Sequence, residues 1–147
     1  MSTFDPTTTP ADYAGDLSPQ EAWDLLASDD RAILVDVRTA AEWRYVGVPD
    51  LGPLGRAAAF VEWVDYPSGT PNAHFVDQLA AAGVAVGSPV VFLCRSGVRS
   101  IGAAKATTAA GLGPAYNILD GFEGALDPDH HRGNDGWRAV GLPWTQS

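Results

Sequence analysis

Short apolar segments rich in β-branched residues alternate with helical segments along most of this chain. Residues 32–37 (AILVDV) and 89–93 (PVVFL) are nearly continuous apolar runs, and residues 57–63 and 115–119 also indicate strands. A strand without alternating polar positions is covered on both faces, as strands of a parallel sheet are. The helical segments between the strands supply the crossovers that parallel strands require. The alternation therefore predicts an α/β fold in which helices flank a central parallel sheet on both faces.

Capping boxes mark two helix starts. Ser18 precedes Glu21 by three residues, and Thr39 precedes Glu42 by the same spacing. In a capping box the hydroxyl accepts a hydrogen bond from the third helical N–H, and the glutamate accepts one from the backbone N–H of the hydroxyl residue. We therefore expect helices that begin directly after Ser18 and Thr39. Two further helices are expected, around residues 75–80 and over residues 100–110.

The length of the chain, 147 residues, suits one α/β domain and is too short for two ordinary ones. Residues 1–13 lack periodic apolar positions and predict a flexible N-terminal arm, so residues 14–147 are expected to form the domain. Residues 127–135 (DPDHHRGND) are polar and predict a surface loop. Beyond that loop, Trp137 and Trp144 are expected to pack the C-terminal tail back onto the domain.

The charge of the chain bears on its partners. The formal net charge is -9 at pH 7 and there is a single lysine, so nucleic acid would meet repulsion and no basic stripe. No apolar stretch approaches the ~20 residues of a membrane-spanning helix. The first residues lack the basic and apolar segments of a secretory signal. We therefore expect neither nucleic acid nor membrane as a partner, and a cytoplasmic location.

The single cysteine, Cys94, stands at the end of an apolar strand and before a loop and a helix. Ligands of an open α/β sheet bind beyond the carboxyl ends of its strands, so this is the position of a site residue. One cysteine cannot form an internal disulfide. It is a buried inert side chain, an intermolecular linker or a reactive thiol, and the residues around it favour the reactive thiol.

The loop after Cys94 concentrates groups that stabilise an anion. Its residues are Arg95, Ser96, Gly97, Val98, Arg99 and Ser100. A strand-to-helix loop turns backbone N–H groups toward one point, where the helix N-terminus adds positive partial charge. Gly97 permits a positive φ or a close backbone approach, and Arg95 with Arg99 can hold an oxyanion such as thiosulfate. These effects lower the pKa of a cysteine, so Cys94 is predicted to be a nucleophile that needs no histidine base.

Residues 94–99 (CRSGVR), with the apolar strand before them, resemble the active-site loop of the rhodanese family. The resemblance extends over residues 17–143, and this loop is its most discriminating part. The other segments that resemble the family are, in chain order, residues 36–38 (DVR) with Glu42, residues 119–122 (LDGF), Trp137 and residues 141–143 (GLP). After Glu42 the family often has a glycine-histidine-isoleucine run, whereas this chain has residues 47–49 (GVP) and lacks that histidine.

The resemblance implies a rhodanese-like fold with a five-stranded parallel sheet, sulfurtransferase activity, and no metal or organic cofactor. Cys94 corresponds to the residue that accepts a sulfur atom as a persulfide, and residues 95–100 correspond to the loop and helix start that hold it. A basic residue after the cysteine resembles the thiosulfate-using branch of the family. We therefore expect thiosulfate as the donor, a thiol or cyanide as the acceptor, and ping-pong kinetics.

Other polar residues are interpreted as supporting or structural. The resemblance makes Arg38 and Glu42 a structural ion pair, and a strand-end charge pair with a helix-capping glutamate accounts for Asp36 as well. Adjacent His130 and His131 lack the usual spacing of metal ligands, so no metal is expected. The acidic residues around these histidines, which could otherwise suggest a metal site, are Asp127, Asp129 and Asp135.

Two rival functions remain open. Cysteine phosphatases and related arsenate reductases have a cysteine, five residues and then an arginine, whereas this chain has Ser100 in that position and Arg99 one residue earlier. The shorter loop suits a single sulfur atom and is too small for a phosphoryl group. The second rival is a non-catalytic rhodanese-like module that binds a partner or senses oxidants or persulfides, since a reactive thiol is also readily oxidised.

Overall fold

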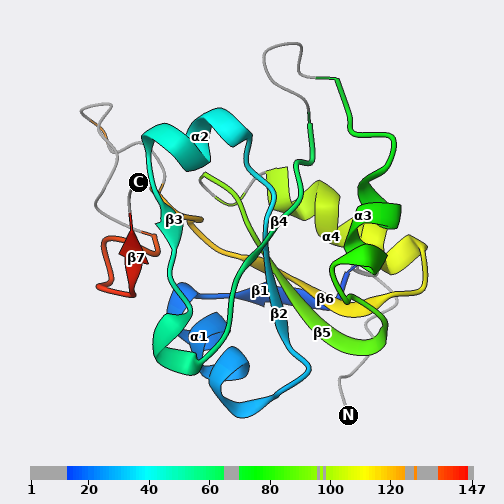
Figure 1. Ribbon diagram of the computed structural model, residues 1–147, viewed down its shortest axis with the longest axis horizontal. Helices are drawn as coiled ribbons and strands as arrows, with labels where there is room; N and C mark the ends of the chain where they lie inside the picture. Colours follow the sequence, from blue (N-terminus) through cyan, green and yellow to red (C-terminus); the bar gives the residue numbers. More distant parts are fainter. Residues whose placement is uncertain are drawn as a thin grey trace.

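A sheet of five parallel strands forms the centre of the protein (Figure 1). The computed structural model describes residues 13–64 (the side chain of Tyr45 excepted), 70–95, 97, 99–124, 128 and 136–145. The strands are β1 (Gly15–Leu17), β2 (Ile33–Asp36), β4 (Ala59–Phe60), β5 (Val86–Leu93) and β6 (Gly113–Ile118). They lie in the order β1-β6-β5-β2-β4, and every pairing is parallel. The α/β fold with a five-stranded parallel sheet is confirmed.

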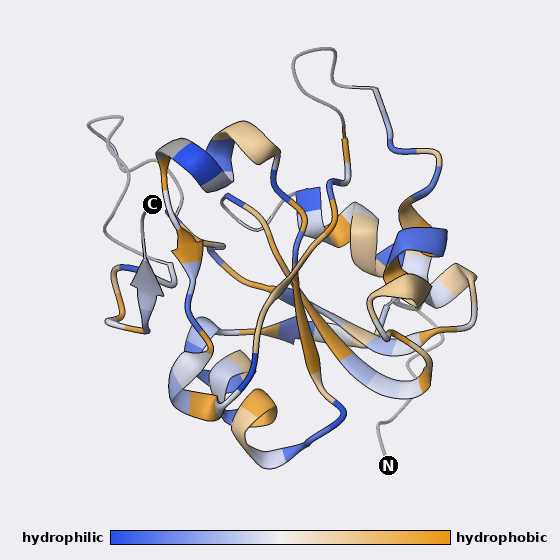
Figure 2. Cartoon of the chain, in the orientation of Figure 1, coloured by the Kyte–Doolittle hydropathy of each residue, from blue (hydrophilic) through white to orange (hydrophobic). Residues whose placement is uncertain are grey.

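Helices cover both faces of the sheet. They are α1 (Pro19–Ser28), α2 (Ala40–Tyr45), α3 (Phe75–Ala81) and α4 (Arg99–Ala109), and a short 3₁₀ turn, η1 (Gly52–Leu54), precedes β4. Both predicted capping boxes are formed, one at the start of α1 and one at the start of α2. β2, which lies between β5 and β4, carries mostly hydrophobic colours in Figure 2, as a strand covered on both faces should.

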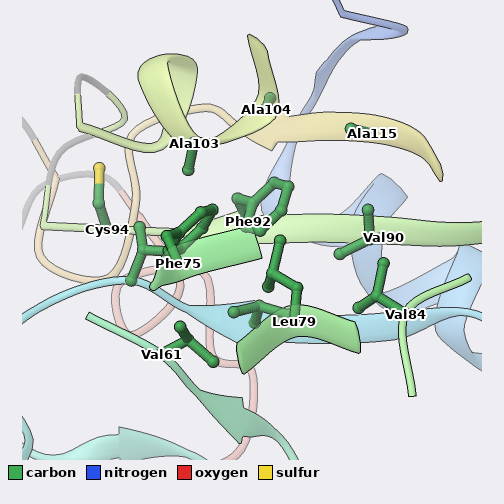
Figure 3. Packing of buried hydrophobic residues seen from close by; sticks show 12 residues of the cluster. Val61, Phe75, Leu79, Val84, Val90, Phe92, Cys94, Ala103, Ala104 and Ala115 are labelled. Carbon is green, nitrogen blue, oxygen red and sulfur yellow. The ribbon is translucent and has the colours of Figure 1, made fainter. Parts of the chain in front are cut away.

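Alternate side chains of β5 enter two separate cores. Val90 and Phe92 pack in the core under α3 and α4, whereas Val91 and Leu93 pack in the core under α1. This period of two is the ordinary geometry of a strand. It places the next residue, Cys94, on the same face as Phe92, and Figure 3 shows its sulfur at the edge of the cluster that α3, α4 and β5 form.

The C-terminal segment returns to the domain through a small second sheet. β3 (Val48–Pro49) pairs antiparallel with β7 (Trp144–Thr145). Trp137 is fully buried, its indole N–H donates to the Pro143 carbonyl at 2.7 Å, and its ring meets Trp23 edge-on at 5.8 Å. The ring of Trp144 packs edge-on against Phe122 at 6.0 Å. Both tryptophans anchor the tail, as predicted.

Several strand boundaries differ from the sequence prediction. β1 was not predicted, because three residues that include a glycine carry no local strand pattern. β4 has two residues where residues 57–63 were expected, since this edge strand pairs on one side alone, with Val35 and Asp36 of β2. Residues 1–12 of the predicted arm and residues 127–135, apart from Pro128, lie outside the described residues. Within the described part of the chain, no helix is long and apolar enough to cross a membrane.

Candidate active site

Cys94 lies directly after β5, at the carboxyl end of the sheet, and its side chain is 1% exposed. Among the described residues, two polar groups contact its sulfur. The backbone N–H of Gly97 donates to Sγ at 3.1 Å, and the hydroxyl of Ser100 lies 3.1 Å from Sγ. The sulfur is therefore not enclosed by apolar side chains alone, because an amide N–H is directed at it and a hydroxyl oxygen lies beside it.

Gly97 makes the tight loop possible. Its φ is +94°, a conformation that side chains rarely adopt, and a Cβ at this position would lie 3.0 Å from the backbone nitrogen of Asp120 and 3.3 Å from the carbonyl oxygen of Ile118. The expected close backbone approach at Gly97 is confirmed. Ser96 and Val98, the other predicted loop residues between Cys94 and Arg99, lie outside the described residues.

The segment after β6 holds the backbone of the loop from the other side. The N–H of Phe122 donates to the Cys94 carbonyl at 2.8 Å, and the N–H of Glu123 donates to the Arg95 carbonyl at 2.9 Å. Gly121 has a φ of +58°, and a Cβ there would collide with the Cys94 carbonyl oxygen. The LDGF motif thus matters because its backbone can approach the loop after Cys94 this closely.

A chain of hydrogen bonds runs from the buried sulfur to the exposed edge of the sheet. The Ser100 hydroxyl donates to the Asn117 side-chain oxygen, and the Asn117 amide nitrogen donates to Asp16 at 3.0 Å. Ser100 and Asn117 are both fully buried. Sequence reasoning missed Asn117 and Asp16. One signal was present, because an asparagine inside the apolar run AYNIL must find buried hydrogen-bond partners.

Arg99 and Arg95 each pair with a glutamate. Arg99 donates two hydrogen bonds to the Glu42 carboxylate, at 2.7 and 2.9 Å. Arg95, 49% exposed, lies 3.4 Å from Glu123. The two positive charges expected to hold an oxyanion are therefore partly neutralised before any donor arrives.

Contact with Arg99 affects the pKa of Glu42 in the opposite direction to burial. Burial alone would raise the pKa of Glu42, but hydrogen bonds from Arg99 and Thr39 and the nearby positive charges lower it. The hydrogen bonds to Glu42 raise the pKa of Arg99 against the effect of burial, and Coulombic interactions with Cys94 and Asp36 act in the same direction. Arg99 thus remains a cation that interacts with the sulfur.

The resemblance implied an ion pair between Arg38 and Glu42, and this prediction is wrong. Arg38 pairs with Asp36, since its Nη2 donates to Asp36 Oδ2 at 2.6 Å, and both side chains are fully buried. The same nitrogen donates to the Gly47 carbonyl at 2.7 Å. Two residues apart on extended chain, Asp36 and Arg38 point to the same side, and the fold brings Arg99 to Glu42 instead.

Arg38 also stacks on Phe122, in the segment after β6 that contacts the loop. Its guanidinium lies over the Phe122 ring, 4.3 Å from the ring centre. The loop after Cys94 is therefore supported in two ways. Arg38, paired with Asp36, contacts Phe122, and Glu42 binds Arg99. His130, His131 and the aspartates beside them lie outside the described residues.

This chain is similar to one family model and to several known proteins. The family model "Rhodanese-like domain" matches residues 18–127. An uncharacterized protein of Rickettsia conorii is 39% identical over 125 residues, which cover 84% of this chain and 91% of that protein. The crystal structure of Rv0390 from M. tuberculosis is 58% identical and has a TM-score of 0.84, over 92% of this chain and 99% of that one. The polysulfide-sulfur transferase of Wolinella succinogenes is 26% identical and has a TM-score of 0.62, over 93% of this chain and 81% of that one.

Proposed function

Because this chain belongs to the rhodanese-like domain family, we propose that it is a sulfurtransferase which carries one sulfane sulfur atom on Cys94 as a persulfide. The observation that carries the proposal is the contact of the Gly97 N–H with the Cys94 sulfur, in a loop between β5 and α4. An N–H directed at sulfur stabilises the negative charge of a thiolate, and also that of a persulfide held in the same place. The positive charge of Arg99 acts on the sulfur in the same direction.

The proposed reaction has two half-reactions. In the first, the Cys94 thiolate attacks the outer sulfur of thiosulfate, the new bond joins Sγ to that sulfur, the sulfur–sulfur bond of thiosulfate breaks, and sulfite leaves with the electron pair. In the second, an acceptor thiolate or cyanide attacks the outer sulfur of the persulfide and Cys94 leaves as a thiolate. The enzyme returns to its starting state without a cofactor, and ping-pong kinetics follow.

Thiosulfate is the donor that we propose, and the half-exposed Arg95 is the charge that first meets it. The pairing of Arg95 with Glu123 at 3.4 Å is loose, so an oxyanion can compete for the guanidinium. The structural similarity to a polysulfide-sulfur transferase supports sulfane donors as a class. Polysulfide is therefore the comparison substrate for thiosulfate.

Phosphate-ester hydrolysis is disfavoured by the identity and contacts of Ser100. Where the phosphatases have an arginine, this chain has a fully buried serine whose hydroxyl contacts Asn117 and Cys94. No guanidinium can reach a phosphoryl group from that position.

Intact-protein mass spectrometry tests the proposal. After incubation with thiosulfate, and separately with polysulfide, the native protein is expected to gain one sulfur atom that dithiothreitol removes. The Cys94→Ser variant, which differs by one atom, is expected to gain none. A native protein that gains no sulfur from either donor would refute the proposal in favour of a non-catalytic binding module. Equal uptake by native protein and Cys94→Ser would refute the role of Cys94.

A further inference from the structure

The Ser100 hydroxyl lies between two groups that compete for its hydrogen. Its oxygen is 3.1 Å from the Cys94 sulfur, and it donates to the side-chain oxygen of Asn117. A serine hydroxyl has one hydrogen and two lone pairs. While that hydrogen is directed at Asn117, the contact with Cys94 requires the thiol S–H as donor.

Asn117 is held in the orientation that makes it an acceptor toward Ser100. Its amide nitrogen donates to Asp16 Oδ1 at 3.0 Å, and a carboxylate can only accept. The Tyr13 hydroxyl donates to the same oxygen of Asp16 at 3.0 Å. The Asn117 oxygen therefore faces Ser100, because the opposite end of the amide is fixed at the neighbouring strand.

Strand order brings these groups together. Asn117 on β6 stands between Asp16 on β1 and Phe92 on β5, with which it is in register on either side. Ser100 is in the first turn of α4, which covers the face that Phe92 and Cys94 share. A row of hydrogen bonds thus crosses the sheet from the exposed Asp16 to the buried sulfur.

We propose that Ser100 and Asn117 are positioning residues which oppose the ionisation of Cys94, against the Gly97 N–H and Arg99 that favour it, because Asn117 competes with the sulfur for the single Ser100 hydroxyl hydrogen. When the thiol proton leaves to water, the Cys94–Ser100 hydrogen bond loses its donor. The Ser100 hydrogen then either turns to the thiolate, which leaves the Asn117 oxygen without its donor, or stays on Asn117, which leaves the thiolate without a hydroxyl donor. Ionisation loses one hydrogen bond in both cases. The inference rests on the proposed function for its purpose, since it names the groups that govern the nucleophile.

Arg99 and Tyr13, which flank this network, keep their protonation state near neutral pH. Arg99, beside Ser100 on α4, has a raised pKa through its hydrogen bonds to Glu42, so it stays cationic. Burial and the contact with Asp16 raise the pKa of Tyr13, so it stays protonated. On β2, Asp36 and its partner arginine form the buried pair described above. The titration of the sulfur is therefore separable from that of Arg99 and of Tyr13.

The test is a pH titration of the thiolate by its ultraviolet absorbance, with Cys94→Ser as the blank that removes tyrosine and backbone contributions. Asn117→Leu keeps the approximate size of the side chain and removes the competing acceptor. We expect it to lower the midpoint of the Cys94 titration by about one pH unit, which is about tenfold more thiolate below the midpoint, as for one charge-assisted hydrogen bond gained in place of a neutral one.

We call the competition for the Ser100 hydrogen the relay. The double variant Ser100→Ala/Asn117→Leu separates the relay from a structural effect. Without the hydroxyl there is nothing to compete for, so Asn117→Leu should leave the midpoint of Ser100→Ala unchanged. Ser100→Thr, which restores a hydroxyl, should restore the downward shift. An unshifted midpoint in Asn117→Leu, or an equal shift with and without the Ser100 hydroxyl, would overturn the proposal.

A second pair of variants covers the case in which the buried Asn117→Leu fails to fold. Asp16 is exposed, and Asp16→Ala frees the Asn117 amide to invert, so it should lower the midpoint in the presence of Ser100 and not in its absence. Asp24→Ala removes another exposed carboxylate, from α1 on the other face of the sheet, and should leave the midpoint unchanged. A shift in Asp16→Ala that persists without Ser100 would show a through-space charge effect and would refute the relay.

The titration does not depend on sulfur transfer. A native protein that takes up no sulfur, yet follows the expected pattern of midpoints, would refute the proposed function and leave the relay standing. Normal sulfur uptake with unchanged midpoints would refute the relay and leave the proposed function standing.

Discussion

Replacing Glu42 by glutamine is expected to destabilise the protein at neutral pH and to have little effect in acid. The change removes one charge and keeps the size of the side chain. Glu42 accepts two hydrogen bonds from Arg99, at 2.7 and 2.9 Å, and also closes the capping box of α2. The variant keeps one neutral acceptor for Arg99 and loses the ionic part of the contact.

The magnitude follows from the geometry and the exposure of the pair. A hydrogen bond to a charged group contributes roughly 1.5–3 kcal/mol and a neutral one about 1 kcal/mol. The Arg99 and Glu42 side chains are 28% and 19% exposed, so water screens part of this difference. We expect the free energy of unfolding to fall by about 1–2 kcal/mol at pH 7.

The pH dependence gives the sign of the effect. Because the pKa of Glu42 is lowered in the folded protein, its contribution is present above the ordinary carboxyl pKa and is lost as the pH falls through the folded value. The difference between native protein and Glu42→Gln should therefore shrink toward the lowest pH at which the native protein stays folded. Urea is the suitable denaturant because it adds no salt, and tryptophan fluorescence reports unfolding.

Glu21→Gln is the matched control. Glu21 closes the capping box of α1 in the same way and, within the described part of the chain, has no arginine partner. Its replacement should produce a smaller loss of stability than Glu42→Gln at pH 7. Equal losses in the two variants, or a loss in Glu42→Gln that does not change with pH, would refute the reasoning and assign the whole effect to the cap.

Two further predictions concern the support of the loop. Arg38→Met leaves the buried Asp36 carboxylate without its cation. It should lower the free energy of unfolding, measured by urea denaturation, by about 3–5 kcal/mol. A loss below about 1 kcal/mol would contradict this, since exposed ion pairs contribute that little. Gly121→Ala would place a Cβ 2.6 Å from the backbone carbonyl carbon of Arg95, and should both destabilise the protein and slow sulfur uptake. The control is Gly111→Ala, which has a φ of +80° and open space around it, so it should destabilise less and leave sulfur uptake unchanged; equal behaviour of the two variants would show that backbone conformation alone explains the loss.

Local patterns predicted the parts of the fold whose cause is local. The capping boxes at Ser18 and Thr39 predicted the starts of α1 and α2, because the partners of those hydrogen bonds lie three residues away. The apolar runs predicted β2, β5 and β6, because a strand buried on both faces needs apolar residues at every position. Cys94 was placed at the carboxyl end of a central strand by the same reasoning, and β1 was missed because three residues have no pattern of their own.

The long-range partners of the charged residues could not be read from sequence. Glu42 and Arg99 are 57 residues apart, and they meet because the carboxyl ends of β2 and β5 are adjacent in the sheet. The resemblance placed Arg38 opposite Glu42, whereas the structure pairs Arg38 with Asp36. Charged side chains are long, and several partners lie within reach of each, so only the packed structure selects among them.

The sequence by itself determined that the chain alternates strands and helices and that its one thiol stands at the edge where such sheets bind ligands. The tertiary structure decided what surrounds that thiol. Ser100, Asn117 and Asp16 come from α4, β6 and β1, and their hydrogen bonds exist only because β6 lies between β1 and β5. Hydrophobic periodicity acts over neighbouring residues and is visible in a sequence, whereas a hydrogen bond across a sheet depends on strand order, which is a property of the folded chain.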